Sequence, residues 1–160
     1  MLWDLEMEEV HHELQSIEPP KRLVLAMKVM EWTLAGFGEI ETPEVRAFIE
    51  HAMQAGRESV AAGHDKMVLS EEFLDTYEEV QEDADEYGTA PFLMAIMGLG
   101  DADEGLSGEV LFGVLNFCYQ AIVLRNEEDD METIEDEMNS PVCTNAIAFQ
   151  KASVLEALRR

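Results

Sequence analysis

The sequence predicts an all-α protein, a single helical domain over residues 1–160 folded as an antiparallel bundle of about six to eight helices. Three observations support this fold class. Apolar residues recur at the three- and four-residue spacing of amphipathic helices. Proline, glycine and capping residues stand where those helices would begin and end. No segment combines strand alternation with hairpin turns. With 47% apolar residues, the chain can build a substantial core without crosslinks.

The first half of the chain contains three predicted helices. A loosely amphipathic helix over 3–17 ends at a pair of prolines, and a second helix over 21–35 ends before a pair of glycines. The third helix has Thr42 as its N-cap and Pro43 at its first position, where an N–H would lack a partner anyway. Its apolar residues follow the pattern i, i+3, i+4, i+7, i+8: Val45, Phe48, Ile49, Ala52 and Met53.

The fourth predicted helix is strongly acidic. Ser70 is its candidate N-cap, and the two glutamates that follow suit the positive end of the helix dipole. An apolar stripe from Phe73 to Val80 gives this helix one buried face. A short apolar helix then opens at 89–91, where a threonine and a proline provide a typical helix start.

The remaining helices include the most apolar part of the chain. Ser107 is the candidate cap of a central helix that ends at Arg125. A short acidic helix follows around 129–138, and Ser140 begins a last helix that runs to the C-terminus. The longest apolar run, 110–124, is interrupted by two polar residues and is shorter than the roughly 20 residues that span a bilayer. We therefore expect the central helix to lie in a protein core and not in a membrane.

The charge of the chain is large and uneven. Ten basic residues stand against 35 acidic ones, which gives a formal net charge of −25. Residues 1–66 contribute −7, residues 67–150 contribute −20, and residues 151–160 contribute +2. Such a surface repels the phosphates of nucleic acid, which bind to clustered lysine and arginine. The same charge accelerates association with a cationic protein, so we expect a basic protein partner and no nucleic acid.

Two acidic clusters form the candidate binding surface. On the fourth helix, six carboxylates are expected on one side, opposite the apolar stripe. Like charges at i, i+4 destabilise a helix by a few tenths of a kcal/mol each, so folding alone does not favour this arrangement. The second cluster directly follows the central helix. The candidate partner-binding residues are Glu71, Asp75, Glu78, Glu82, Asp85, Glu86, Glu127, Glu128, Asp129 and Asp130.

Two other functions fit the same acidic residues. Glu79 and Glu82 form one ExxE pair, and Glu132 and Glu135 form another. Residues three apart share a helix face, so two such pairs could hold Mg²⁺ between helices, as in all-α nucleotide pyrophosphohydrolases. The basic residues that would hold the phosphates are missing nearby. The other alternative is a helical adaptor domain whose charge serves only solubility.

The remaining composition indicates a cytoplasmic setting. The N-terminus is acidic, whereas a signal peptide needs a basic region followed by an apolar one. Cys118 and Cys143 are too few for a disulfide scaffold and lack metal-binding spacing, so we expect reduced thiols. The four histidines also lack a metal-binding spacing. We expect no cofactor, no bound metal, no catalytic residues, and a monomer or homodimer.

Residues 19–57 resemble a known family. Six residues of this segment can fill the sequence pattern of that family: Arg22, Ala26, Glu31, Pro43, Arg46 and Ile49. It is similar to the opening of immunity protein type 5, a family of helical immunity proteins in bacterial polymorphic toxin systems. A cysteine and a basic residue of the family pattern are absent here, where Val29 and Trp32 stand nearby. The resemblance implies a cytosolic antidote that binds one cognate toxin without catalysis, and it carries over no functional residue.

These observations lead to one functional hypothesis. The chain is expected to be a non-enzymatic, all-α binding protein whose acidic surface neutralises a basic partner by occlusion. Its carboxylates would pair with active-site lysine and arginine, and exposed apolar residues would supply the strongest contacts. A toxin nuclease, or another enzyme that acts on nucleic acid, is the kind of partner that this surface suits.

Overall fold

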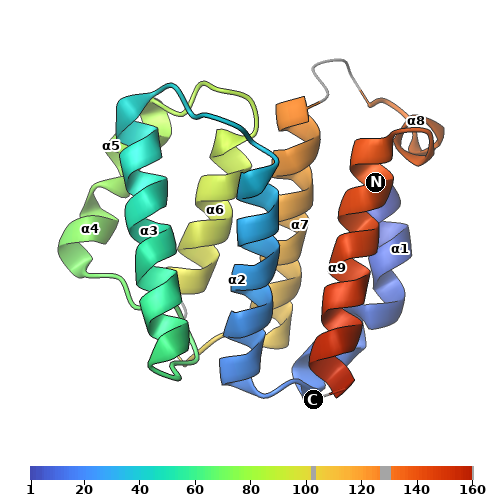
Figure 1. Ribbon diagram of the computed structural model, residues 1–160, viewed down its shortest axis with the longest axis horizontal. Coiled ribbons are helices and arrows are strands. Elements are labelled where there is room, and N and C mark those ends of the chain that lie inside the picture. Colours follow the sequence, from blue (N-terminus) through green and yellow to red (C-terminus); the bar gives the residue numbers. More distant parts are fainter. Residues whose placement is uncertain (102–103, 127–130, 160) are drawn as a thin grey trace.

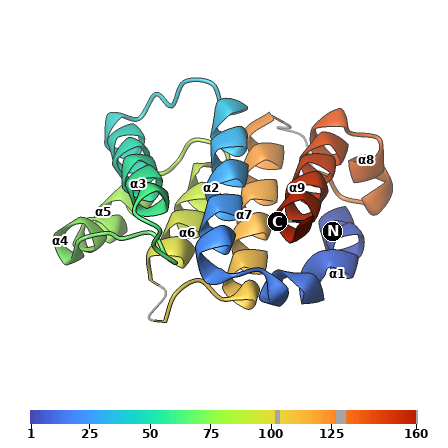
Figure 2. The same cartoon turned by 60° about the horizontal axis from the view of Figure 1, so that its bottom comes forward.

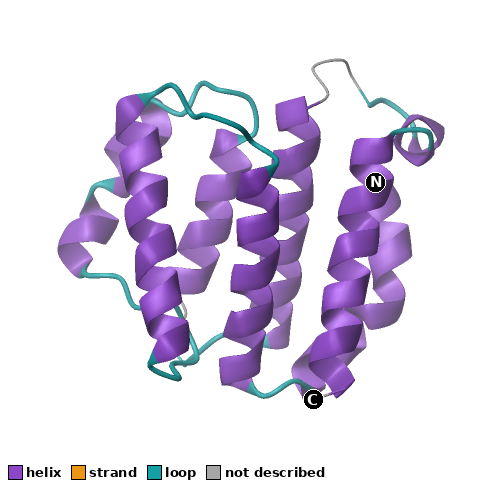
Figure 3. Cartoon of the chain, viewed as in Figure 1, coloured by secondary structure: helices purple, strands orange, loops and turns teal. Residues whose placement is uncertain are grey.

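The computed structural model describes residues 1–101, 104–126 and 131–159, and within these ranges the chain is helical with no strand (Figure 3). The predicted all-α bundle is confirmed. Its six long helices are α1 (Leu2–His11), α2 (Pro19–Ala35), α3 (Pro43–Ala61), α6 (Thr89–Gly100), α7 (Gly108–Asn126) and α9 (Pro141–Arg159). The shorter elements are the 3-10 helix η1 (His12–Ser16) and the helices α4 (Glu71–Asp75), α5 (Tyr77–Glu82) and α8 (Ile134–Met138).

The long helices form two layers. Figures 1 and 2 show α3, α2 and α9 side by side in one layer, and α6, α7 and α1 in the layer behind it. The short helices α4 and α5 lie at the edge next to α3, and α8 lies at the opposite edge, near α1 and α9 (Figure 1).

Consecutive long helices run antiparallel, as their short connections predict, with the exception of α3 and α6, which run in the same direction (Figure 1). The two central helices, α2 and α7, also run in the same direction as each other (Figure 1). This happens because α4 and α5 carry the chain back along the bundle before α6 begins.

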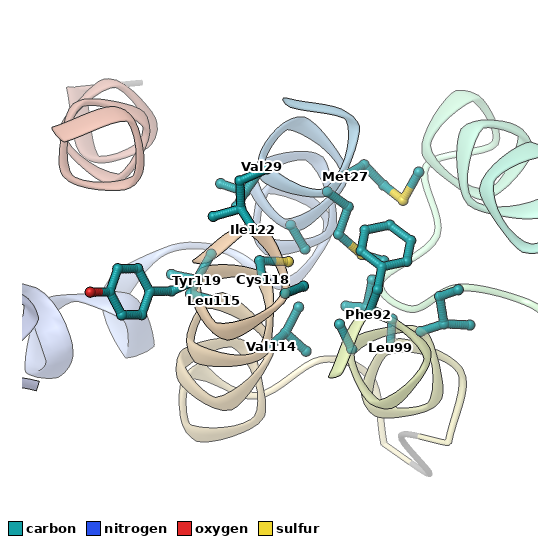
Figure 4. Packing of buried hydrophobic residues seen from close by; sticks show 14 of the residues in the cluster. Met27, Val29, Phe92, Leu99, Val114, Leu115, Cys118, Tyr119 and Ile122 are labelled. Atoms are coloured by element: carbon teal, nitrogen blue, oxygen red, sulfur yellow. The ribbon is translucent and has the colours of Figure 1, made fainter. Parts of the chain in front are cut away.

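Helix α7 is the centre of the core, as its apolar run predicts. Figure 4 shows Val114, Leu115 and Cys118 among the buried side chains of α2 and α6, whereas Tyr119 points away from this cluster. A buried polar tie crosses the two layers: the Trp3 indole donates to Gln150 at 2.7 Å, and the Gln150 amide donates to the carbonyl of Leu115 at 2.9 Å. These bonds join α1, α9 and α7 without leaving a buried polar atom unpaired among the described side chains.

The predicted serine caps are confirmed. The hydroxyls of Ser70, Ser107 and Ser140 accept from the backbone N–H three residues further on, at 3.1, 3.1 and 3.3 Å. Thr42 does precede α3, with Pro43 at the first helical position, but its side chain does not cap that helix. Instead, the Thr42 hydroxyl donates to Glu86 at 2.9 Å.

Several predicted boundaries were wrong. The first helix ends at His11 and continues as η1, and the two prolines begin α2 instead of preceding it. The predicted fourth helix is broken into α4 and α5, because the Thr76 hydroxyl donates back to the carbonyl of Phe73 at 2.6 Å and competes with the helical pattern. Helix α5 ends at Glu82, so the last carboxylates of the acidic run lie in a loop and not on the helix face expected for them.

The second acidic helix is also shorter than predicted. Helix α8 begins at Ile134, where Thr133 and Asp136 form a reciprocal capping box. The part of the predicted helix before residue 131 lies outside the described residues.

Candidate partner-binding surface

The segment 71–86 forms an acidic edge of the bundle. It contains nine acidic residues and no basic one. Apolar contacts fix its orientation: the ring of Phe73 stacks on Phe48 of α3, with 4.4 Å between centroids, and Tyr77 lies 6.1 Å from the same ring. Since the aromatic side chains face α3, the carboxylates of α4 and α5 face solvent.

Most of these carboxylates have no internal partner. Eight of the nine are exposed, and none of the eight lies within ion-pair distance of a basic group in the described part of the chain. We call these eight residues the acidic edge: Glu71, Glu72, Asp75, Glu78, Glu79, Glu82, Asp83 and Asp85. Their charge is therefore available to an external cation.

Glu86, which the sequence groups with them, is bound internally. Its carboxylate accepts from Arg125 at 3.0 Å and from the backbone N–H of Thr42 at 2.7 Å. Burial alone would raise the pKa of Glu86, but the hydrogen bonds from Arg125 and Thr42 outweigh it and hold the pKa below its ordinary value. Arg125 also donates to the carbonyls of Phe37 and Glu39, so the pair ties α7 to the loop before α3.

The ten candidate residues therefore separate into three groups. Five belong to the acidic edge: Glu71, Asp75, Glu78, Glu82 and Asp85. Glu86 holds two parts of the fold together. The other four, Glu127, Glu128, Asp129 and Asp130, lie outside the described residues.

Basic residues gather in one layer of the bundle. Seven of the ten lie on α2, α3 and α9, against five acidic residues on the same helices, so these three helices sum to +2. A groove of about 370 Å³ between α2 and α9 has Lys21 and Lys28 on its rim, and Lys28 pairs with Glu156 at 2.6 Å. The negative charge is therefore concentrated on the rest of the molecule, and the protein is electrically polarised.

The two ExxE pairs lie on opposite sides of the bundle. Glu79 and Glu82 belong to α5, whereas Glu135 belongs to α8, and these helices stand at opposite edges (Figure 1). Glu132 precedes α8, so the second pair does not share a helical turn. No group of three or more His, Cys, Asp or Glu side chains that could hold a metal ion occurs in residues 1–101, 104–126 or 131–159.

Two charged side chains are buried, although nothing in the sequence distinguishes them from the exposed charged residues. Glu137 looks like one more acid of a long acidic run, yet its carboxylate accepts from the backbone N–H of Leu2 at 2.9 Å and from the Tyr119 hydroxyl at 2.6 Å. Burial, and then hydrogen bonds with Cys143 and Glu137, raise the pKa of Tyr119. Glu137 thus fixes α8 against the start of α1.

Arg22 is the second of these residues. Its guanidinium is buried and donates to three backbone carbonyls, those of Leu14, Gln15 and Leu106. Burial lowers the pKa of Arg22. These bonds hold η1 against the loop before α7, so Arg22 has a role inside the fold.

Comparison with protein-family models, curated proteins and solved structures yields no match for this chain. No helix among the described residues has the length and apolar character needed to cross a membrane.

Proposed function

We propose that this chain is an acidic binding protein that neutralises a basic protein partner by occluding it. One observation carries the proposal: the eight carboxylates of the acidic edge fall within residues 71–85, are exposed, and form no ion pair within the described residues. Six of them belong to two short helices that aromatic stacking holds in place, and Asp83 and Asp85 lie in the loop that follows. No catalytic step is part of this proposal, and the chain would act by binding alone.

The partner class follows from the chemistry of the surface. Enzymes that act on nucleic acid bind phosphates with clustered lysine and arginine, and an acidic helical edge can occupy such a cluster in place of the phosphates. A toxin nuclease is the partner that we favour, because residues 19–57 resemble immunity protein type 5 of bacterial toxin systems. Such an antidote would act in the cytoplasm.

The acidic edge is expected to set the speed of association more than the strength of the complex. Exposed ion pairs contribute little free energy each, since water and salt screen them. Their summed field nevertheless steers a cationic protein and can raise its association rate by one to three orders of magnitude at low ionic strength. The tightness of the complex must therefore come from apolar contacts elsewhere.

A growth assay followed by kinetics tests the proposal. The basic protein encoded beside this chain is expressed alone and together with it; rescue of growth identifies the partner. Association with that partner is then measured at about 50 and 500 mM salt, a range that shortens the screening length from over 10 Å to about 4 Å. The triple variant Glu78→Gln, Glu82→Gln, Asp85→Asn is expected to associate roughly tenfold more slowly at low salt.

The matched control removes three exposed carboxylates from the opposite edge. Glu8→Gln, Glu13→Gln, Glu135→Gln makes the same change in net charge, and none of these three side chains has an ion pair in the described part of the chain. Equal slowing in both triple variants would mean that only net charge matters. An association rate that depends neither on salt nor on the acidic edge would contradict the proposal.

A further inference from the structure

The outward face of α6 and α7 is apolar and uncharged. Helix α6 contains no charged residue, and α7 contains only Glu109 and Arg125. We call the following six residues the α6/α7 face: Tyr87, Met94, Val110, Gly113, Phe117 and Leu124. Four of them, Tyr87, Met94, Val110 and Leu124, are large exposed apolar side chains. They are four of the eleven large exposed apolar side chains of the described residues, and contiguous apolar patches mark interaction sites.

Glycine contacts show that α6 and α7 pack closely against each other. A Cβ at Gly88 would meet Ala121, and a Cβ at Gly98 would meet Val114 at 3.1 Å. The two helices are therefore in close antiparallel contact over their whole shared length. This register places Met94 level with Phe117, and Tyr87 level with Leu124.

The face has the spacing that another helix requires. On α7, Val110, Phe117 and Leu124 stand at three successive a positions of a heptad repeat, with Gly113 at the first d position and the polar residue Gln120 at the second. They extend over about 21 Å of helix, or roughly four turns. A Cβ at Gly113 would meet nothing within 4 Å, so the backbone there is open to close approach by another chain.

The charges around the face are acidic. Asp83 and Asp85 precede α6, and Asp101 and Glu104 follow it; all four are exposed and form no ion pair with the described residues. A second copy of the chain would bring two such acidic rims together, which like-charge repulsion opposes. A helix with lysine or arginine beside its apolar stripe complements both the face and its rim.

We infer that the α6/α7 face binds a cationic amphipathic helix of the partner. The inference rests on the proposed function, to which it adds the apolar contact surface and the shape of the segment that fills it. The partner approaches the layer of α6, α7 and α1, because the layer of α2, α3 and α9 carries a net charge of +2 and offers no attraction to a basic protein.

The test uses a synthetic helical peptide of about 18 residues, with leucine at the a and d positions and lysine elsewhere. A control peptide has the same composition but places its leucines around the whole helix. The protein variant is Met94→Ser, Val110→Ser, Leu124→Ser, which removes apolar surface without changing charge. The matched control is Val24→Ser, Leu155→Ser, whose side chains are 49% and 46% exposed, against 44% for Met94 and 45% for Leu124, and which lie on α2 and α9.

Binding is measured by fluorescence anisotropy, and oligomeric state by sedimentation equilibrium. We expect the amphipathic peptide to bind the wild-type protein at least tenfold more tightly than the control peptide does. The Met94/Val110/Leu124 variant should bind the amphipathic peptide at least tenfold more weakly than wild type, whereas the Val24/Leu155 variant should bind it within about twofold of wild type. Equal binding of both peptides, or equal binding by both variants, would overturn the inference while leaving the acidic edge and the proposed function intact. No binding of either peptide, or a dimer that only the Met94/Val110/Leu124 variant abolishes, would also overturn it.

Discussion

The strongest stability prediction concerns the Glu86–Arg125 pair. The two side chains are 20% and 15% exposed, and Glu86 accepts three hydrogen bonds, from Arg125 and from the backbone and hydroxyl of Thr42. Glu86→Gln keeps the volume of the side chain but removes the charge. A hydrogen bond to a charged group contributes about 1.5–3 kcal/mol, and breaking a fully buried ion pair costs about 3–5 kcal/mol. Because this pair is partly exposed, we expect a loss of about 2–3 kcal/mol.

The pH dependence of that loss has a definite sign. The folded-state pKa of Glu86 lies below its ordinary value of 4.5, so the stabilisation is fully present above pH 4.5 and is lost as the pH falls through the folded-state pKa. The difference in free energy of unfolding between wild type and Glu86→Gln should therefore be largest at neutral pH and shrink in acid. Taking the difference between the two proteins removes the contribution of all other carboxylates, which titrate in both.

Urea denaturation of both proteins at neutral pH and at pH values below 4.5 measures this difference. At neutral pH the melting temperature should also fall by about 5–10 °C, given the usual 2–4 °C per kcal/mol for a chain of this size. Glu82→Gln is the control, since this exposed carboxylate has no ion pair in the described part of the chain, and it should change stability by less than about 0.5 kcal/mol. A difference in free energy of unfolding between wild type and Glu86→Gln that stays constant or grows in acid would refute the assigned role of Glu86.

Three further predictions follow from buried groups and backbone geometry. Arg22→Met leaves three carbonyls without their donor and should cost about 2–4 kcal/mol in thermal or chemical denaturation; a loss below 0.5 kcal/mol would contradict the role of its bonds. Glu137→Gln and Tyr119→Phe should each cost about 1–2 kcal/mol, with the double variant losing less than the sum because both break one contact; strict additivity would argue against coupling. Gly88→Ala should cost more than about 3 kcal/mol, since φ is +83° and the new Cβ would collide with an α7 carbonyl, whereas Gly63→Ala, at φ +74° with open space around it, should cost about 1–2 kcal/mol.

The features that were predictable from sequence are the local ones. Ser70, Ser107 and Ser140 were recognisable as caps because a cap depends on a few adjacent residues and its hydrogen bond closes within one turn. The central position of α7 was recognisable because its apolar run has no equal in the chain. Those predictions required no knowledge of which helices become neighbours.

The features that were not predictable depend on contacts far apart in sequence. Glu86 and Glu137 lie in acidic runs like any other glutamate, and only partners 39 and 18 residues away distinguish them. The break at Thr76 depends on a competition between a hydroxyl and a helical N–H for one carbonyl, which helix propensity does not resolve. The difference in net charge between the two layers was not predictable either, because it depends on α2, α3 and α9, which are separated in sequence, packing into one layer.

The different roles of Glu86 and of the exposed carboxylates beside it also explain how such a crowded acidic edge can fold. Eight unpaired carboxylates on a short segment repel one another, and neither α4 nor α5 is long enough to be stable alone. The segment is held at one end by the ring of Phe73 against α3 and at the other by the carboxylate of Glu86 against Arg125. Between these anchors the repulsion is unrelieved in the free protein, and a cationic partner would relieve it. Part of the binding free energy would then come from electrostatic strain already present in the unbound chain, which is why neutralising the edge should slow association while making the free protein more stable.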